Sequence, residues 1–404
     1  MKYDIPVYEP TLTGNEQKYV MDCVQSGWIS GRGSYVQAFE EQFSAYTGVG
    51  KATTVSNGTV ALHLALMALG IGPGDEVIVP TFTYIAPVNA IVYCGATPVF
   101  VDSRSDTWQV DAEDIRRRIT LKTKAIIAVH LYGHPCEMDE LTAIAREHRL
   151  FLLEDCAEAF GTLYKGKHVG QFGDISTFSF YGNKTITTGE GGMVVTNDET
   201  LYQRSLHLKG QGLAKYREYW HDVVGYNYRM TNICGAIGLA QLERADEFIT
   251  RKRQIASIYA EMLSGTGFTP HHEVGDVFHS YWMCSVLTPQ AHQRDKVREF
   301  LKQNGIETRP TFYPVHTMPM YSQKYERHAI AENIAMRGIN LPSYPGLTDE
   351  QVVRVATALK EGLEHIDVMN AVKKFSLLQT TPVVKKQEYK TVSPDAKNIV
   401  NAAS

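Results

Sequence analysis

The sequence predicts an α/β fold in which a mostly parallel central sheet is covered by helices on both faces and is followed by a smaller α+β domain. Short apolar runs alternate with helical segments through the first half of the chain, as in buried parallel strands joined by crossover helices. After Asn197 this alternation is replaced by longer helices and scattered short strands. The chain has 404 residues, of which 44% are hydrophobic, so it can bury a sizeable core in more than one domain.

Periodicity places the elements of the first half in chain order. Phe39, Phe43 and Tyr46 recur at helix spacing, whereas the run 60–69 is apolar nearly all round and is expected to be a buried helix. We expect helices over residues 14–27, 36–47, 60–69, 86–94, 111–118, 138–147 and 199–208. We expect strands over residues 51–55, 76–80, 97–102, 124–130, 151–154 and 176–181. Ligands of such a sheet bind beyond the carboxyl ends of its strands.

The second half is expected to begin with a long helical region over 233–259, which could break near Asp246. Beyond it we expect further elements, namely a strand at 279–287, a helix at 291–304 and a closing helix at 350–365. The predicted domains are a large domain over 1–250 that includes the N-terminal helices, a small domain over 251–365 and a mobile tail over 366–404. The tail is assigned because it is rich in lysine and lacks sustained periodicity.

Charge and cysteine usage exclude several classes of function. The formal net charge is −4, which gives no overall attraction to nucleic acid or anionic lipid. The six cysteines show no CxxC spacing, as expected for reduced thiols in the cytoplasm. The N-terminal residues lack the apolar run of a signal peptide, and no window reaches the ~18 apolar residues of a membrane span. We therefore expect a soluble cytoplasmic protein without nucleic-acid or membrane partners.

Lys184 is the first candidate for chemistry. It follows a predicted strand in the sequence SFYGNKTITTGEGG, whose glycines allow a tight turn. Most lysines are solvated surface charges, but such a turn can direct this one inward. A buried amine with a lowered pKa can form a Schiff base with an aldehyde. It can then move a proton between two carbons as general base and acid.

Asp155 is the second candidate, at the end of the apolar run LFLLED. A carboxylate at that edge is costly to desolvate unless a cation or a donor meets it. A protonated pyridine nitrogen is such a partner, and the protonated ring becomes an electron sink. On position alone, an N-cap for the following CAEAFG segment is an equally good interpretation. Taken with Lys184, this carboxylate indicates pyridoxal 5'-phosphate.

Two further segments could hold such a cofactor. The turn SNGT at 56–59, between a strand and a buried helix, offers backbone N–H groups and a positive helix end to a phosphate. It lacks the spacing of a P-loop, and Asn57 or Thr59 could cap the helix at the same time. Tyr84, after the strand at 76–80, could stack on the ring or pack in the core.

Other motifs are interpreted structurally. His130, His134 and Cys136 look like metal ligands, but HLYGHPC reads as a strand entering a turn and has no fourth ligand at zinc spacing. We therefore predict no metal site. The sequence KGQG at 209–212 is too short for a dinucleotide fingerprint. The loop SGWISGRG at 26–33 could contact a ligand or a partner subunit, or could simply connect two helices.

Together these motifs resemble those of the sugar aminotransferases of the DegT/DnrJ/EryC1/StrS type. The resemblance runs from about residue 4 to residue 364 and rests on SNGTVAL, PTFTYIAP, EDCAEAFG, SFYGNK with GEGG, and NYRMTN. It implies the fold type I architecture of pyridoxal-phosphate-dependent transferases, similar to aspartate aminotransferases, with residues 1–250 as the cofactor-binding domain. It also implies a homodimer with shared active sites.

The resemblance assigns roles to individual residues. Lys184 corresponds to the Schiff-base lysine, Asp155 to the partner of the ring nitrogen, and Tyr84 to the stacking aromatic. Members that dehydrate sugars have His in place of the lysine, so its presence here favours amino transfer. The full set of expected cofactor contacts is Asn57, Gly58, Thr59, Tyr84, Asp155, Glu158, Ser179, Lys184 and Asn227.

Five positions concern specificity or the neighbouring subunit, and the resemblance implies the roles of the first three. Glu158 stands where many relatives have Gln near the ring hydroxyl, a departure that could mark a subgroup. Asn227 would reach the phosphate of the neighbouring subunit's cofactor, with Arg229 close to that shared site. Tyr313 and His316 could contact the sugar nucleotide, or could equally be packing residues.

The implied reaction is transfer of an amino group from glutamate to carbon 4 of a nucleotide-linked 4-keto-6-deoxy sugar. The segments 175–198 and 308–321 most resemble members that act on GDP-4-keto-6-deoxymannose. UDP- or dTDP-linked keto sugars are the nearest alternative substrates. A cofactor-binding regulator without turnover is an alternative from another class, and dehydration or epimerisation of the sugar is a third.

Overall fold

The computed structural model describes residues 3–322 and 325–380, and the chain divides into two compact units, 1–363 and 364–404. The helices in the described residues are α1 (Glu16–Ser26), α2 (Ser34–Thr47), α3 (Gly58–Leu69), α4 (Ile85–Tyr93), α5 (Ala112–Arg118), α6 (Met138–His148), α7 (Glu199–Lys209), α8 (Asn232–Leu242), α9 (Ala245–Leu263), α10 (Arg294–Gln303), α11 (Ala329–Arg337) and α12 (Asp349–Thr380). The strands are β1 (Lys51–Val55), β2 (Glu76–Pro80), β3 (Thr97–Val101), β4 (Thr123–Val129), β5 (Phe151–Asp155), β6 (Leu163–Tyr164), β7 (Lys167–His168), β8 (Ile175–Ser179), β9 (Gly192–Thr196), β10 (Thr269–Pro270), β11 (Val277–Phe278), β12 (Cys284–Leu287), β13 (Arg309–Pro310) and β14 (Gly338–Leu341).

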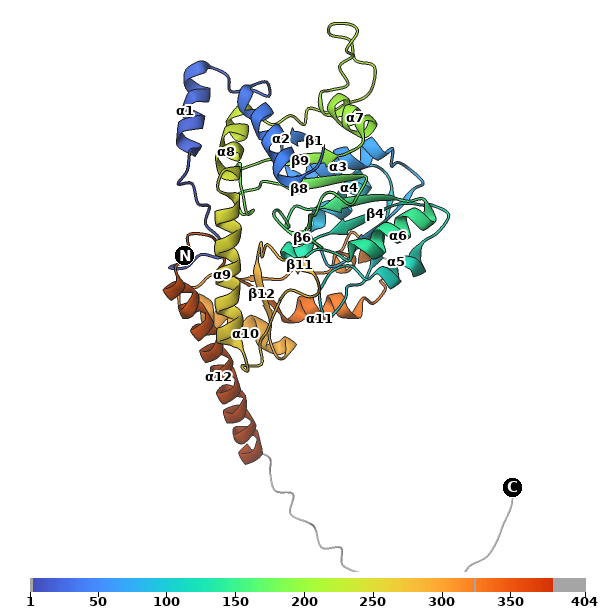
Figure 1. The fold of residues 1–404 in the computed structure, drawn as a ribbon. Helices are drawn as coiled ribbons and strands as arrows, with labels where there is room; N and C mark the ends of the chain where they lie inside the picture. Colours follow the sequence, from blue (N-terminus) through green and yellow to red (C-terminus); the bar gives the residue numbers. More distant parts are fainter. Residues whose placement is uncertain (1–2, 323–324, 381–404) are drawn as a thin grey trace, which may run out of the picture. The chain divides into compact units, whose positions relative to one another are not determined.

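The central sheet of the first unit has seven strands in the order β1-β9-β8-β5-β4-β2-β3 (Figure 1). Strands β8, β5, β4, β2 and β3 are mutually parallel, whereas β9 runs antiparallel to both of its neighbours. Asp155 at the end of β5 pairs with Thr177 of β8 on one side and with Val129 of β4 on the other. The predicted, mostly parallel sheet is therefore confirmed, and its carboxyl edge gathers the ends of several strands.

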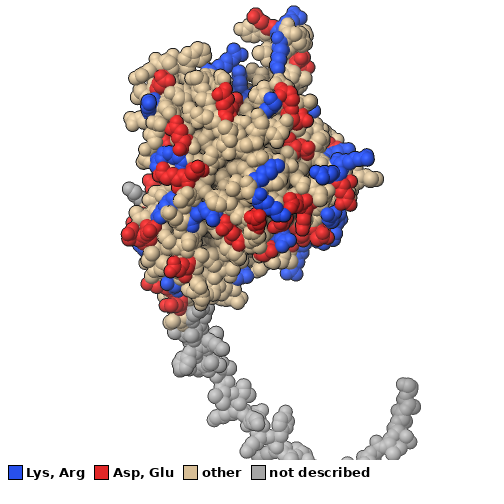
Figure 2. Space-filling model, in the orientation of Figure 1, with Lys and Arg blue, Asp and Glu red and all other residues tan. Residues whose placement is uncertain are grey.

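Helices cover both faces of this sheet, as the continuously apolar strands predict. On one face, α3 and α4 pack on alternate strand residues such as Val79 and Ile127. On the other face, α5 and α6 pack on Ile78 and Ile126, and the phenylalanines of α2 pack on Phe178. Figure 2 shows acidic and basic side chains interspersed over the face that it draws.

The region after β9 contains long helices and short strands, as the sequence predicts, and its β11 pairs with β6 from the first half of the chain. In Figure 1, α8 and α9 form one yellow column interrupted at residues 243–244, close to the expected break at Asp246. Strands β10, β12, β14 and β13 form a four-stranded antiparallel sheet, and β11, β6 and β7 form a three-stranded one. Since α9 runs through position 250, the boundary expected there falls inside a helix, and the division into 1–250 and 251–365 stays a prediction.

The expected strand over 279–287 is wrong in its first half. Strand β12 begins only at Cys284, because the preceding residues form an irregular loop in which Tyr281 has a left-handed backbone with φ of 49°. The Tyr281 N–H donates to His279 Nδ1 at 2.9 Å, and the Ser280 N–H donates to the Gly133 oxygen at 3.2 Å. Hydrogen bonds within the loop and to the distant Gly133 therefore replace the strand pairing that the alternation predicts.

The closing helix is longer than expected. Helix α12 extends to Thr380 instead of ending at His365, so the part of the predicted tail from 366 to 380 is helical. That segment contains no glycine or proline before Pro382, so nothing in it interrupts a helix. The remaining tail prediction, residues 381–404, lies outside the described residues. Among the described helices, none is long and apolar enough to cross a membrane.

Candidate active site

The carboxyl edge of the central sheet brings together the residues that the sequence singles out. Asp155 ends β5 and Ser179 ends the adjacent β8, and Lys184 lies in the turn five residues later. The Lys184 N–H donates to the Tyr181 oxygen at 2.9 Å, and the Tyr8 hydroxyl donates to the Lys184 oxygen at 2.6 Å. These backbone contacts hold the turn so that the lysine side chain points inward.

The Lys184 amine is buried close to an acid and an aromatic ring. Its side chain is 13% exposed, and Nζ lies 3.9 Å from Glu158 Oε1 and 3.9 Å from the centre of the Trp282 ring. Burial lowers the pKa of this amine, while the negative charges of Glu158 and Asp155 oppose that shift. A lowered pKa makes the neutral, nucleophilic amine more accessible.

Within the described residues, the buried carboxylate of Asp155 has no cation within 4.0 Å. It is 4% exposed, and its Oδ1 accepts the Ala157 N–H at 3.1 Å. Residues 156–161 form turns, so the N-cap interpretation is wrong, because no helix follows. Burial raises the pKa of Asp155, and the Ala157 N–H and the charge of Lys184 oppose that shift. A protonated ring nitrogen would supply the positive partner that a desolvated carboxylate needs.

The turn at 56–59 forms a cradle against the end of β8. The Asn57 side chain caps α3 by accepting the Val60 N–H at 3.0 Å, so the capping interpretation is confirmed. A Cβ atom at Gly58 would lie 2.7 Å from Ser179 Cβ, so only glycine permits this close approach. The first turn of α3, including Thr59, therefore lies beside the Ser179 side chain. The free N–H groups and positive end of this 12-residue helix suit a phosphate.

Glu158 is held inside the site by a strained tyrosine. Its Oε2 accepts the Tyr132 N–H at 2.9 Å. Tyr132 is fully buried and has a left-handed backbone with φ of 57°, a conformation that costs a non-glycine residue energy and often marks functional sites. Burial raises the pKa of Glu158 to about 7, although the charge of Lys184 and the Tyr132 N–H lower it.

Tyr84 lies on the surface of this edge. It precedes the first residue of α4 and is 56% exposed, so the interpretation as a core residue is wrong. Its ring is tilted against Phe312, with 5.7 Å between ring centres. Phe312 in turn stacks on Tyr132 at 5.3 Å, so the three rings form one aromatic wall. A stacking role for Tyr84 on a bound ring stays a prediction that its exposure permits.

Asn227 and Arg229 are exposed and lie beside the cradle of their own chain. The Arg229 Nη2 donates to Asn227 Oδ1 at 3.4 Å. The intervening Tyr228 accepts the Ser56 N–H at 2.8 Å through its backbone oxygen. This contact places the segment at the carboxyl edge of the sheet, and its role toward a second subunit stays a prediction.

The two residues expected to contact the sugar nucleotide have different surroundings. Tyr313 is 50% exposed, and its hydroxyl lies 3.4 Å from Arg294 Nη2. His316 is 3% exposed, with Nδ1 2.6 Å from Thr81 Oγ1 and Nε2 3.3 Å from Glu332 Oε1. Since both of its ring nitrogens are engaged, the surroundings of His316 support the packing interpretation and not a substrate contact.

The histidine and cysteine pattern near residue 130 is a buried hydrogen-bond network. His130 Nε2 lies 3.1 Å from Glu154 Oε2, and its Nδ1 accepts the Cys136 N–H at 3.0 Å. Glu154 also accepts the backbone N–H groups of Gly170, Phe172 and Gly173. His130, Glu154 and Cys156 come close enough to hold an ion, but the imidazole and carboxylate are already satisfied by these bonds.

Three residues of the site escape sequence reasoning. Trp282 lies in a segment that alternation assigns to a strand, and Tyr8 carries no recognisable signal. Tyr132 follows the carboxyl end of β4, a position that could have drawn attention because ligands bind at that edge. For these three residues, the only signal in the sequence is that Tyr132 follows a strand end. That signal marks Tyr132 as close to the ligand-binding edge but does not indicate what it does there.

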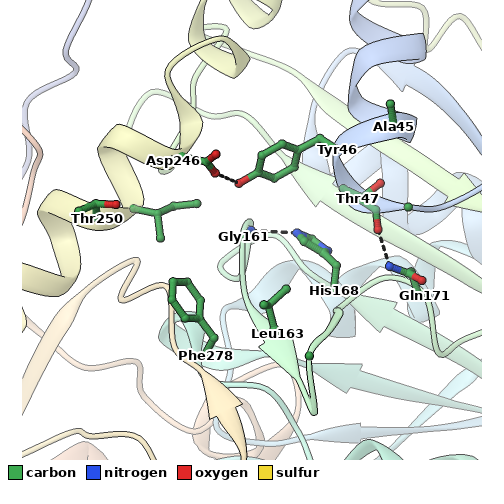
Figure 3. A pocket seen from close by; sticks show the side chains of 13 residues that line it. Ala45, Tyr46, Thr47, Gly161, Leu163, His168, Gln171, Asp246, Thr250 and Phe278 are labelled. Carbon is green, nitrogen blue, oxygen red and sulfur yellow. Dashed lines mark hydrogen bonds between the residues drawn. The ribbon is translucent and has the colours of Figure 1, made fainter.

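A separate cavity of about 490 Å³ lies between α2, the β6–β7 segment and α9 (Figure 3). Its polar side chains are engaged with one another, since Tyr46 donates to Asp246 Oδ1 at 2.8 Å and His168 Nε2 accepts the Gly161 N–H at 3.0 Å. None of the predicted site residues lines it. The predicted site residues therefore lie at the sheet edge and not in this cavity.

The residues at the sheet edge fit pyridoxal phosphate. A buried amine, a buried carboxylate without a close cation and a glycine-lined helix start match the aldehyde, the ring nitrogen and the phosphate of that cofactor. The correspondence rests on residues from three separate segments of the chain.

Comparison with known proteins gives matches along most of the chain. The family model of the DegT/DnrJ/EryC1/StrS aminotransferases matches residues 10–360. The chain is 64% identical to GDP-perosamine synthase of Escherichia coli O157:H7 over 361 residues, which cover 89% of this chain and 99% of that protein. It is 55% identical to GDP-perosamine synthase of Vibrio cholerae over 360 residues, covering 88% and 98%. The pyridoxal-phosphate form of a putative sugar aminotransferase, Spr1654 of Streptococcus pneumoniae, superposes with a TM-score of 0.85 at 29% identity, covering 91% of this chain and 100% of that one.

Proposed function

Because the chain belongs to the DegT/DnrJ/EryC1/StrS aminotransferase family, we propose that it transfers an amino group from glutamate to carbon 4 of GDP-4-keto-6-deoxymannose, giving GDP-perosamine. The chain is a pyridoxal-phosphate-dependent sugar aminotransferase of fold type I, as its sequence predicts. The observation that carries the choice of substrate is the similarity to two GDP-perosamine synthases over nearly their whole length.

The cofactor would be held by residues of the sheet edge. Lys184 would bind its aldehyde, and Asp155 would bind the ring nitrogen. Tyr84 would stack on the ring, while the phosphate would lie in the cradle of residues 57–59 and Ser179. When bound, the cofactor supplies an electron sink for the carbon that carries the amino nitrogen.

The chain's own residues then perform the proton transfers. With the cofactor bound, Lys184 Nζ would act as a general base and remove a proton from the substrate carbon. The same atom would then return that proton to a second carbon as a general acid. The carboxylate of Asp155 would stabilise a positive charge on the ring nitrogen. The two half-reactions, with glutamate and with the keto sugar, need the same lysine.

A homodimer with shared active sites is part of this proposal. The segment between α7 and α8 extends away from α7 in Figure 1, and it exposes large apolar side chains. Tyr219 is 92% exposed and Val224 is 87% exposed, and such patches favour association with another protein surface. We infer that this segment packs on a second copy, where Asn227 would reach the partner's cofactor phosphate and Arg229 would lie close to that site.

The proposed substrate is tested with a panel of nucleotide-linked 4-keto sugars and glutamate. Formation of GDP-perosamine and 2-oxoglutarate from the GDP-linked sugar, well ahead of the UDP- and dTDP-linked sugars, is the expected result. Preference for a UDP- or dTDP-linked sugar would overturn the choice of base but not the reaction type. Lys184→Ala serves as the control, since it should lose both the visible absorbance of the bound cofactor and turnover.

The same panel addresses the remaining alternatives. A cofactor-binding regulator would keep its visible absorbance unchanged on addition of glutamate, and dehydration or epimerisation would give a sugar product without nitrogen. We place the enzyme in the cytoplasm, because nucleotide sugars are charged substrates and the cysteines show no disulfide spacing.

A further inference from the structure

Glu158 is the acid closest to the reactive amine. Within the described residues it is the only carboxylate with an oxygen inside 4.0 Å of Lys184 Nζ, at 3.9 Å. The Glu158 side chain is 5% exposed and that of Lys184 is 13% exposed. The other buried carboxylate of the site, Asp155, makes its hydrogen bond to the Ala157 N–H instead.

A single residue positions both neighbours of the amine. The backbone N–H of Tyr132 binds Glu158 Oε2, which leaves Oε1 to face Lys184. The ring of Tyr132 stacks on Trp282 with 6.1 Å between centres and 13° between planes. The centre of the Trp282 ring lies 3.9 Å from Lys184 Nζ. Because Tyr132 holds a left-handed backbone to do this, the arrangement is maintained against local strain.

We propose that Glu158 is the proton partner of Lys184: when the buried amine gives up its proton to become a nucleophile, Glu158 Oε1 accepts that proton. The ammonium–carboxylate pair then becomes a neutral amine beside a neutral carboxylic acid, so no net charge is created in the buried site. No other bond forms or breaks. This inference rests on the proposed function, since it concerns how the cofactor-binding amine is activated.

The electrostatics of the pair support this exchange. Burial penalises both charged forms, raising the pKa of Glu158 to about 7 and lowering that of Lys184. The two groups also face Asp155, whose charge favours a proton on either of them. When acid and base approach one another in pKa, moving a proton between them costs little. A glutamine at this position, as many relatives are expected to have, could not accept the proton.

The test measures the amine itself. The full-length chain, freed of cofactor, is treated briefly with an amine-acylating reagent from pH 5 to 11, and the labelling of Lys184 is followed by mass spectrometry. A shared proton gives labelling in two steps separated by a plateau, because the neutral-amine form is populated independently of pH between the two titrations of the pair. Glu158→Gln should give a single step. A single step in the unsubstituted chain overturns the proposal and leaves Glu158 as an ordinary ion-pair partner.

Infrared spectroscopy gives an independent readout if Glu158→Gln fails to fold. The unsubstituted chain at neutral pH should show a carboxylic acid band that shifts to lower wavenumber when its glutamate residues are labelled with ¹³C and that is lost at high pH. Its absence would also overturn the proposal. Glu40→Gln is the matched control, because Glu40 Oε1 lies 3.5 Å from a different buried lysine, Lys209, and it should leave the Lys184 profile unchanged. Neither readout uses glutamate or a nucleotide sugar as substrate, so failure here is distinct from failure of the proposed function.

Discussion

The indole N–H of Trp282 donates a 2.7 Å hydrogen bond to the backbone oxygen of Asn183, the residue before Lys184. The centre of the same ring lies 3.9 Å from Lys184 Nζ. One side chain therefore contacts both the backbone and the amine of this turn, although almost 100 residues separate it from the turn.

Replacement of Trp282 should weaken cofactor binding in two graded steps. Trp282→Phe keeps an aromatic face and loses the hydrogen bond, worth ~0.5–1.5 kcal/mol. Trp282→Leu also loses the face, worth a further ~0.5–2 kcal/mol. We expect the dissociation constant for pyridoxal phosphate, measured by visible absorbance, to rise about two- to tenfold for Phe and further for Leu. Equal effects for both variants would contradict a contribution from the ring.

Gly58→Ala should impair the phosphate cradle more than the fold. The added Cβ would lie 2.7 Å from Ser179 Cβ, so one of the two elements must shift. We expect the affinity for pyridoxal phosphate and for inorganic phosphate to fall about tenfold or more, equivalent to ~1.4 kcal/mol. Isothermal titration calorimetry gives both values. Gly72→Ala is the control, because nothing lies within 4 Å of the added atom there. An unchanged phosphate affinity in Gly58→Ala would refute the cradle.

Three buried histidines that pack on one another should make the protein sensitive to acid. Burial lowers the pKa of His134 to about 4 and that of His271 to about 3, and it lowers that of His279 well below its usual value. The unfolded chain binds protons on these residues near pH 6.5, whereas the folded chain does not, so stability falls as pH drops below 6.5.

Each such histidine should lower the free energy of unfolding by ~1.4 kcal/mol per pH unit as the pH falls from 6.5 to the pKa of that histidine in the folded chain. Urea unfolding at pH 7.5, 6.0 and 5.0 should show that loss in the free energy of unfolding. His134→Gln, which can keep a hydrogen bond to the Pro135 oxygen, should make the decline shallower by one histidine's share. An equally steep decline in that variant would contradict the assignment.

The exposed apolar segment between α7 and α8 should control assembly. Val224→Asp places a charge on a side chain that is 87% exposed, so the fold itself should be unaffected. We expect sedimentation to show a shift from dimer to monomer, because a charge buried at an interface is costly. Val353→Asp, at an exposed position of α12, is the control. A variant that remains dimeric would show that this segment lies outside the interface.

Local chemistry made several positions predictable. Asp155 ends β5, the 56–59 turn follows β1 and Lys184 lies in the turn after β8, and strand ends are visible as a change from apolar to polar residues. The helices that cover the sheet were predictable because their apolar residues recur at helix spacing. The strand expected at 279–283 was wrong because its alternation was overridden by hydrogen bonds to Gly133 and within the loop.

The alternating architecture, the ligand-binding edge of the sheet and the residue types that match the cofactor can be predicted from the residues alone, because they depend on periodicity and on the chemistry of single side chains. The positions of Glu158 and Trp282 beside the Lys184 amine and the burial of His316 become visible only in the folded chain. Those relationships join segments more than 20 and up to more than 200 residues apart. No local pattern records which of two distant side chains will meet, since that is fixed by how the whole sheet and its loops pack.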